Sequence, residues 1–142
     1  ILGIIAVAAA ALLVVLFHFQ LKPPRVTVSP QGFSVHSPFY GDDYAMSDVT
    51  DVSLVPTLPC ILARTNGFAG AGTLRGHFRV QGLGEGKLFV EQGTAPYVIV
   101  RLRRTFVIIN FEQPERTQAL YDELRRNWSR KDVATEAQPA PP

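Results

Sequence analysis

The residues whose types could support catalysis or metal binding are few and scattered along this chain. It holds one cysteine, Cys60, and three histidines, His18, His36 and His77. None of them has a carboxylate or another Cys or His at the spacing that zinc sites use, and no nucleophile stands at a recognisable spacing from a base. We therefore predict no catalytic residues, no metal and no cofactor, and we expect Cys60 to be a loop or core thiol.

Two further patterns suggest ligand sites but lack the residues that such sites need. The pair Gly86-Lys87 is followed by Leu88 and a strand pattern, whereas a phosphate-binding loop needs Ser or Thr there and then a helix. An acidic cluster comprises Asp42, Asp43, Asp48 and Asp51. This cluster lacks the spacing, the glycine and the glutamate of a calcium-binding loop. We expect hairpin turns and solvated strand ends at both places.

Arginines are the strongest candidates for a binding surface. Arg101, Arg103 and Arg104 fall within one predicted hairpin, and Arg75 and Arg79 alternate with apolar or small residues between positions 74 and 80. A guanidinium donates paired hydrogen bonds to phosphate or carboxylate, and basic residues are attracted to an anionic leaflet. These five residues form a candidate ligand-binding or anionic-lipid surface. The alternative interpretation is that they are the solvated face of a strand and a turn.

The first residues of the chain predict a transmembrane helix. Residues 1–19 carry no charge, and about 20 apolar residues span the ~30 Å hydrocarbon core as a helix. The residues LFHFQLK at the end of this stretch are bulky and lack the small-residue cleavage site of a signal peptide. A core helix of a soluble domain would normally have a polar face, and this stretch has none. We predict a membrane helix over 1–20 and a linker over 21–24. Lys22 and Arg25 favour a cytoplasmic domain, although the chain begins with Ile, so we expect sequence upstream.

The following residues predict one β-rich domain over 25–130 and a disordered tail over 131–142. Short strand patterns occupy 25–28, 33–36, 44–46, 52–55, 74–80, 87–90, 97–102 and 105–109. The first four and 74–80 have period two, and 105–109 is almost wholly apolar. Asn66-Gly67 predicts a tight turn. From Pro114 the period becomes helical, and an apolar stripe runs to Trp128, which we expect to cover the open end of a barrel. One cysteine excludes an internal disulfide, and the formal net charge of +2 argues against nucleic-acid binding.

Residues 39–124 resemble the pleckstrin-homology-like families of membrane-anchored bacterial proteins. The matching pieces are Phe39-Tyr40-Gly41, Ser47-Asp48-Val49, Leu58-Pro59, Arg64-Thr65-Asn66-Gly67-Phe68, Gly76-His77-Phe78, Gly86-Lys87-Leu88-Phe89-Val90, Pro96-Tyr97-Val98-Ile99, Ile109-Asn110 and Leu120-Tyr121. The resemblance implies an antiparallel barrel or sandwich of about seven strands capped by a C-terminal helix, placed next to a membrane, with no catalytic set. Gln113 stands where similar sequences have a capping Asp, so we expect the helix start to fray or to use Asn110.

Three functions follow as hypotheses. The leading one is a non-enzymatic, membrane-anchored module that binds a protein, or itself, at the membrane surface, with no small-molecule substrate evident. The alternative is a reader of anionic lipid headgroups through Arg101, Arg103 and Arg104. The third is an enzyme or an accessory subunit of one. The first hairpin, VSPQGF, has no basic residue, which disfavours specific phosphoinositide binding.

Overall fold

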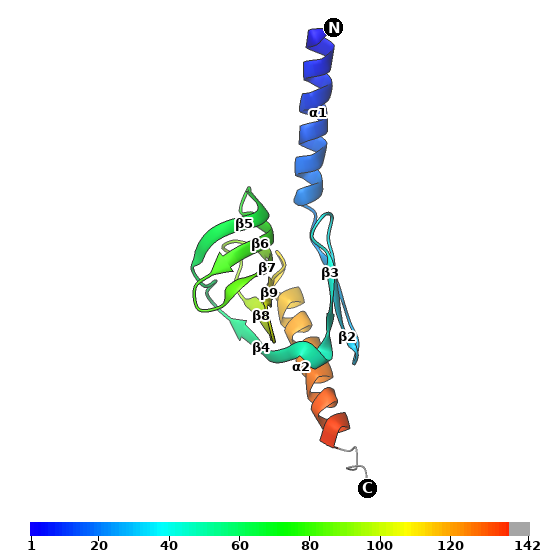
Figure 1. The fold of residues 1–142 in the computed structure, drawn as a ribbon, viewed down its shortest axis with the longest axis vertical. Coiled ribbons are helices and arrows are strands. Elements are labelled where there is room, and N and C mark those ends of the chain that lie inside the picture. Colours follow the sequence, from blue (N-terminus) through cyan, green and yellow to red (C-terminus); the bar gives the residue numbers. More distant parts are fainter. Residues whose placement is uncertain (137–142) are drawn as a thin grey trace.

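The uncharged N-terminal stretch forms one helix, α1 (Leu2–Gln20), which stands apart from the elements that follow it (Figure 1). The computed structural model describes residues 1–136 of the chain, with side chains as far as Ser129. Pro23 and Pro24 follow α1, and their missing N–H groups and fixed φ prevent the helix from continuing into the domain. The helix predicted over residues 1–20 is therefore confirmed as a helix.

Among residues 1–136, the chain after the linker forms nine strands in two sheets and then one long helix, so the protein is mainly β. The elements are β1 (Arg25–Val28), β2 (Gly32–His36), β3 (Asp42–Ala45), the 3-10 turn η1 (Met46–Asp48), β4 (Val49–Val55), β5 (Ile61–Gly70), β6 (Thr73–Val80), β7 (Gly84–Glu91), β8 (Tyr97–Leu102), β9 (Phe106–Ile109) and α2 (Pro114–Glu136). Within this part of the chain, β1, β2 and β3 make a small sheet, and the rest form a larger sheet in the order β4-β8-β9-β7-β6-β5.

The larger sheet is mixed, whereas the sequence predicted an antiparallel one. β7 pairs with β9 in parallel, and Leu88 lies opposite Ile108. β8 pairs antiparallel with both β4 and β9, so it lies between strands that are far apart in sequence. A β-rich domain with a C-terminal helix is confirmed, but its strands do not follow a simple antiparallel order.

Both faces of the larger sheet are buried, which explains why its central strands are almost wholly apolar. In β9, Val107 and Ile109 join one core cluster, and Phe106 and Ile108 join a second cluster on the opposite face. The first cluster lies between the two sheets and α2, and the second lies inside the curve of the larger sheet. Period-two alternation thus divides one strand between two cores.

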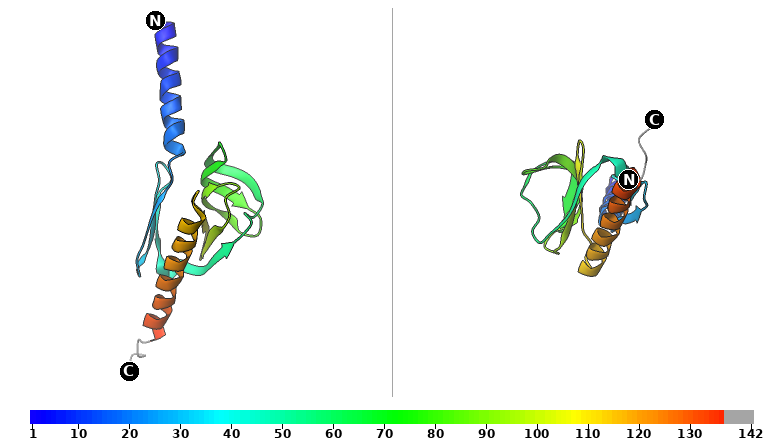
Figure 2. Two further views of the ribbon diagram at one scale, coloured as in Figure 1. Left: turned by 180° about the vertical axis from the view of Figure 1, so that it is seen from behind. Right: turned by 90° about the horizontal axis from the view of Figure 1, so that it is seen from below.

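α2 joins the two sheets. Its predicted stripe is confirmed, because Thr117, Leu120 and Leu124 are buried and Tyr121 and Trp128 pack against the first core cluster. The helix packs against β1, β4, β8 and η1, and Figure 2 shows it running between the two sheets. It therefore covers sheet faces, whereas we predicted that it would close one end of a single barrel.

Two local predictions are wrong. Asn66-Gly67 lies inside β5 and makes no turn, because a bulge before Asn66 lets the chain pass close to β6, where a Cβ on Gly67 would lie 2.7 Å from the Arg75 carbonyl oxygen. The turn instead falls after Gly70, at Ala71 and Gly72, which both have positive φ. α2 also continues to Glu136, past the predicted domain end at residue 130. The rest of the predicted disordered tail, 137–142, lies outside the described residues.

The close approach of β7 and β9 gives a first testable prediction. A Cβ on Gly86 would lie 2.5 Å from the Phe106 carbonyl oxygen, which is backbone and cannot rotate away. We expect Gly86→Ala to lower the free energy of unfolding by about 3 kcal/mol, at the upper end of overpacking costs. Urea unfolding of the full chain in nonionic detergent, followed by Trp128 fluorescence, measures it. Gly82→Ala is the control: its Cβ meets nothing within 4 Å, and only its φ of 79° opposes the change, so we expect about 1 kcal/mol. Equal losses of stability in Gly86→Ala and Gly82→Ala would contradict a collision between a side chain at position 86 and the Phe106 carbonyl oxygen.

Candidate functional site

The place where α1 meets the domain is the candidate site. By length and composition α1 is long and apolar enough to cross a membrane, and the domain buries none of its side chains. The lack of burial separates α1 from the apolar core helices of soluble proteins, which are covered by protein. Lys22, just past its end, lies over the Phe19 ring at 4.4 Å from the centroid. A long basic side chain at a helix end can place its ammonium group at the membrane surface.

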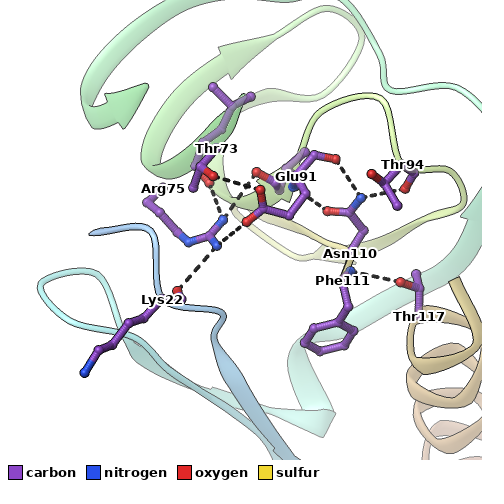
Figure 3. Close-up of polar contacts among 10 residues, drawn as sticks. Lys22, Thr73, Arg75, Glu91, Thr94, Asn110, Phe111 and Thr117 are labelled. Carbon is purple, nitrogen blue, oxygen red and sulfur yellow. Dashed lines mark hydrogen bonds and ion pairs between the residues drawn. The ribbon is translucent and has the colours of Figure 1, made fainter. Parts of the chain in front are cut away.

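A buried ion pair lies beside Lys22 of the linker that follows α1 (Figure 3). Arg75 Nη2 on β6 donates to Glu91 Oε1 on β7 at 2.7 Å, and the side chains are 1% and 16% exposed. Glu91 Oε2 accepts a 2.7 Å hydrogen bond from Thr73 Oγ1. Arg75 also donates from Nη1 to the carbonyls of Leu74 and Val90, at 3.0 and 3.3 Å. The guanidinium is therefore held by one carboxylate and the backbone of two strands.

Arg75 also binds the linker. Its Nη2 donates to the Lys22 carbonyl oxygen at 3.5 Å, across a separation of 53 residues. Burial lowers the pKa of Arg75, while the hydrogen bond and charge of Glu91 act in the opposite direction, and arginine keeps its charge in proteins. This hydrogen bond joins the chain that leaves α1 to β6, the strand next to the edge strand of the larger sheet.

Asn110 adds three hydrogen bonds to this network, and the residue after it bonds to α2. Its Oδ1 accepts from the Glu91 backbone N–H at 2.7 Å, and its Nδ2 donates to the carbonyls of Glu91 and Thr94 at 2.9 and 2.7 Å. The next residue, Phe111, donates its backbone N–H to Thr117 Oγ1 in the first turns of α2. The Asn110 side chain thus stabilises β7 and the loop after it. It does not cap α2, contrary to the alternative that we predicted from the sequence. The junction network is Lys22, Thr73, Arg75, Glu91, Thr94 and Asn110.

An apolar contact accompanies this network. The Phe17 ring of α1 meets Phe68 of β5 edge to face, with centroids 5.4 Å apart. A Cβ on Gly70 would lie 3.1 Å from Phe17 Cε2, so the hairpin between β5 and β6 reaches the side of α1. Two independent contacts, one polar and one aromatic, therefore set the position of the domain below the helix.

The structure separates the five arginines of the candidate binding surface. Arg75 is 1% exposed, so it is not part of a surface, because the linker and Glu91 cover the face of β6 that we predicted to be solvated. Arg79 is exposed and lies opposite Glu85 of β7. Arg101, near the end of β8, and Arg103 and Arg104, in the turn between β8 and β9, are all exposed. The site that sequence reasoning proposed is thereby reduced to this turn.

That turn lies at the end of the domain away from α1 (Figure 1). The Arg103 backbone N–H donates to the Asp48 carbonyl oxygen, beyond the far end of β3. β3 begins at Asp42, which pairs with Val35 close to the linker, and it ends at Ala45, which pairs with Gly32 at the opposite end of the small sheet. Three residues of strand cover about 10 Å, more than the ~8 Å Debye length at physiological salt. These arginines are therefore poorly placed to attract headgroups of a bilayer that holds α1.

Other chemical groups form no recognisable centre. Cys60 is exposed, as expected for a loop thiol. Among the residues the structure describes, no group of three His, Cys, Asp or Glu side chains could hold a metal ion. Lys87 pairs with Asp42 at 3.0 Å and donates to the Tyr40 carbonyl at 3.3 Å. Burial acts to raise the pKa of Asp42, but Lys87 and the Asp43 backbone N–H outweigh it, so the pKa lies below its usual value.

Comparison with known proteins adds no relative: no protein-family model, no curated protein and no solved structure matches this chain. The pleckstrin-like resemblance therefore stays a prediction. Sequence reasoning missed Glu91 and Asn110, the partners that make Arg75 a junction residue. The sequence pattern placed the hairpin turn between β6 and β7 at residues 82–86, whereas in the structure β7 already begins at Gly84. The observed register pairs Val80 with Gly84 and Thr73 with Glu91, and the predicted turn position did not indicate that pairing.

Proposed function

We propose that this chain is a membrane-anchored, non-enzymatic module that holds a β-rich domain at the bilayer surface, where it binds a protein or a second copy of itself. The observation that carries the proposal is α1: it is apolar around its whole circumference, and none of its residues is buried in the domain. In water such a surface would be costly to expose, and a bilayer removes that cost. Lys22 and Arg25 favour the cytoplasmic side.

The junction network supports an anchored role. A domain on a flexible tether needs no specific contact with its anchor, yet Arg75 binds the Lys22 carbonyl and Phe68 packs on Phe17. These contacts orient the domain relative to α1. An orienting contact is useful when a particular face must be presented to a partner next to the membrane.

The edge of β5 supports protein binding. β5 is the outermost strand of the larger sheet, and in the described residues it pairs only with β6. Its bulges end before Asn66, so residues 66–70 form a regular stretch with one free edge. An extended segment of a partner can add to such an edge through main-chain hydrogen bonds. We do not favour headgroup reading by Arg101, Arg103 and Arg104, because they lie at the far end of the domain.

Membrane extraction tests the anchor. We expect the full chain to remain in the membrane pellet after alkaline carbonate washing. The double variant Val7→Arg, Leu12→Arg should move largely to the supernatant, because each charge at the centre of a span costs about 2.5–3.5 kcal/mol. Val7→Leu with Leu12→Val is the matched control and should stay in the pellet. Carbonate release of the unmodified chain would contradict the anchor.

Crosslinking in the native membrane, followed by purification, tests the binding role. A stoichiometric foreign protein would identify an adaptor, and a ladder of the chain with itself would identify a scaffold. Either product should weaken when Ala69→Pro, at an exposed position outside the aromatic contact with Phe17, interrupts the regular stretch of β5. Recovery of monomer alone would contradict protein binding and leave only the anchor.

A further inference from the structure

We infer that the domain itself enters the interfacial layer of the bilayer, through two loops on opposite sides of the lower end of α1. One is the loop between β2 and β3, with Phe39 at its tip, and the other is the hairpin between β5 and β6, residues 68–72. Figures 1 and 2 show the β5–β6 hairpin beside the last turn of α1 and the β2–β3 loop just below the end of the helix, next to the linker. The inference rests on the proposed membrane anchor and names the lipid layer around α1 as the occupant of this end of the domain.

The depth of the β5–β6 hairpin follows from its contact with Phe17. Phe17 lies three residues before the end of α1 at Gln20, which is about 5 Å inside the helix at 1.5 Å per residue. Phe68 and Gly70 lie against Phe17 and are therefore at about the same depth along the axis of α1. If α1 spans the membrane, the tip of this hairpin must therefore lie at or above the level where α1 leaves the apolar layer.

The composition of the hairpin fits that depth. Residues 68–72 read Phe-Ala-Gly-Ala-Gly and carry no polar side chain. Its backbone groups are partly satisfied within the domain, because the Gly72 carbonyl accepts a 2.8 Å hydrogen bond from the Gln92 N–H. A charged or amide side chain here would have to be dehydrated, whereas small apolar residues enter the interface without that cost.

Phe39 is held outward by the loop on the other side of α1. It is 66% exposed and has a φ of 74°, a left-handed conformation that an aromatic residue rarely adopts. The loop is closed by hydrogen bonds from the Gly41 N–H to the Ser37 carbonyl and from the Tyr40 N–H to the Pro38 carbonyl. Backbone strain of this kind persists where the surroundings impose it, most often at functional positions.

The groove between this loop and the linker supplies the charges expected at a headgroup layer. Its lining includes Lys22, Arg25, His36 and Pro38 beside the two aspartates that begin β3. Lys22 and Arg25 are exposed. Apolar side chains that enter the interface beside basic residues are the pattern of peripheral membrane contacts. Phe39, the small-residue hairpin and these two basic residues thus surround the point where α1 leaves the domain.

Site-specific fluorescence tests the inference in the full chain. In a Cys60→Ser background, single cysteines are placed by Phe39→Cys, Ala71→Cys, Arg104→Cys and Ala9→Cys, labelled with an environment-sensitive dye and reconstituted in phosphatidylcholine nanodiscs. Aqueous iodide and lipid-attached nitroxides quench each dye. We expect iodide quenching at positions 39 and 71 to be roughly five-fold weaker than at position 104, as for side chains in the interface. We also expect nitroxides at headgroup level to quench the dyes at positions 39 and 71. Position 9 should respond only to nitroxides on the acyl chains.

The four positions separate the two claims. If position 9 is quenched by lipid but 39 and 71 are as open to iodide as 104, the anchor stands and the inference is overturned. Protection at only one of the two loops also overturns it, because the contact needs both sides of α1. If position 9 is open to iodide, the proposed membrane anchor itself fails.

Discussion

Replacing Glu91 with alanine should lower the free energy of unfolding by about 4 kcal/mol, within the range found when one partner of a buried ion pair is removed. Arg75 stays charged and is 1% exposed, so Glu91→Ala leaves a guanidinium in the protein interior without its carboxylate. The backbone carbonyls of Leu74, Val90 and Lys22 remain as acceptors, but none carries the compensating charge. Urea unfolding of the full chain in nonionic detergent, read from Trp128 fluorescence, measures the loss.

Two companion variants show whether the loss comes from the unpaired charge. Glu85→Ala removes an exposed glutamate from the same strand and should cost less than about 1 kcal/mol, the scale of a cross-strand pair. The double variant Arg75→Met, Glu91→Ala should recover most of the stability lost in Glu91→Ala, because no buried charge remains. A double variant as unstable as Glu91→Ala alone would contradict this account.

Asn110→Asp should cost at least about 4 kcal/mol at neutral pH, although it changes a single atom. The new carboxylate can still accept from the Glu91 N–H, but it cannot donate to the carbonyls of Glu91 and Thr94, which it then faces as a negative charge. Each unsatisfied buried group costs about 1–3 kcal/mol, and a buried charge costs more. Asn110 is 1% exposed, so water cannot easily replace the lost donors.

The same unfolding measurement at two pH values isolates the charge. Part of the loss in Asn110→Asp should be regained near pH 4, where a buried aspartic acid whose pKa is raised by desolvation takes up a proton. Asn66→Asp, an exposed position on β5, is the control and should change stability by less than about 0.5 kcal/mol. Similar losses at positions 66 and 110 would show that the three hydrogen bonds of Asn110 contribute little.

Local patterns in the sequence predicted strands well and their surroundings poorly. The alternation at residues 25–28 and the apolar run after Pro96 at 97–102 predicted β1 and β8 with the observed bounds. The same alternation placed Arg75 on a solvated face, because period two states only that neighbouring side chains point to opposite faces. What covers each face depends on where the linker and β7 pass, and those positions come from pairings between distant segments.

The errors at Asn66-Gly67 and in the order of the larger sheet have the same origin. Asn-Gly favours a tight turn in isolation, yet here Gly67 is needed because a side chain would collide with the backbone of β6. Likewise, Thr105 to Ile109 read as a strand, but no local signal indicates that β9 pairs with β7 in parallel. The apolar helix, by contrast, is a property of composition alone and was predicted to within a residue at each end.

The order of the larger sheet has a consequence for how the protein is made. Among residues 1–136, β4 pairs only with β8, and β7 reaches β8 only through β9, so the sheet cannot be completed until residue 109 has been synthesised. At 5–20 residues per second, α1 precedes that point by roughly 5–20 seconds. The apolar helix is thus available for capture by a bilayer while most of the sheet is still unpaired. The domain would then finish folding as an already tethered chain, with its loops beside the lipid that they are proposed to enter.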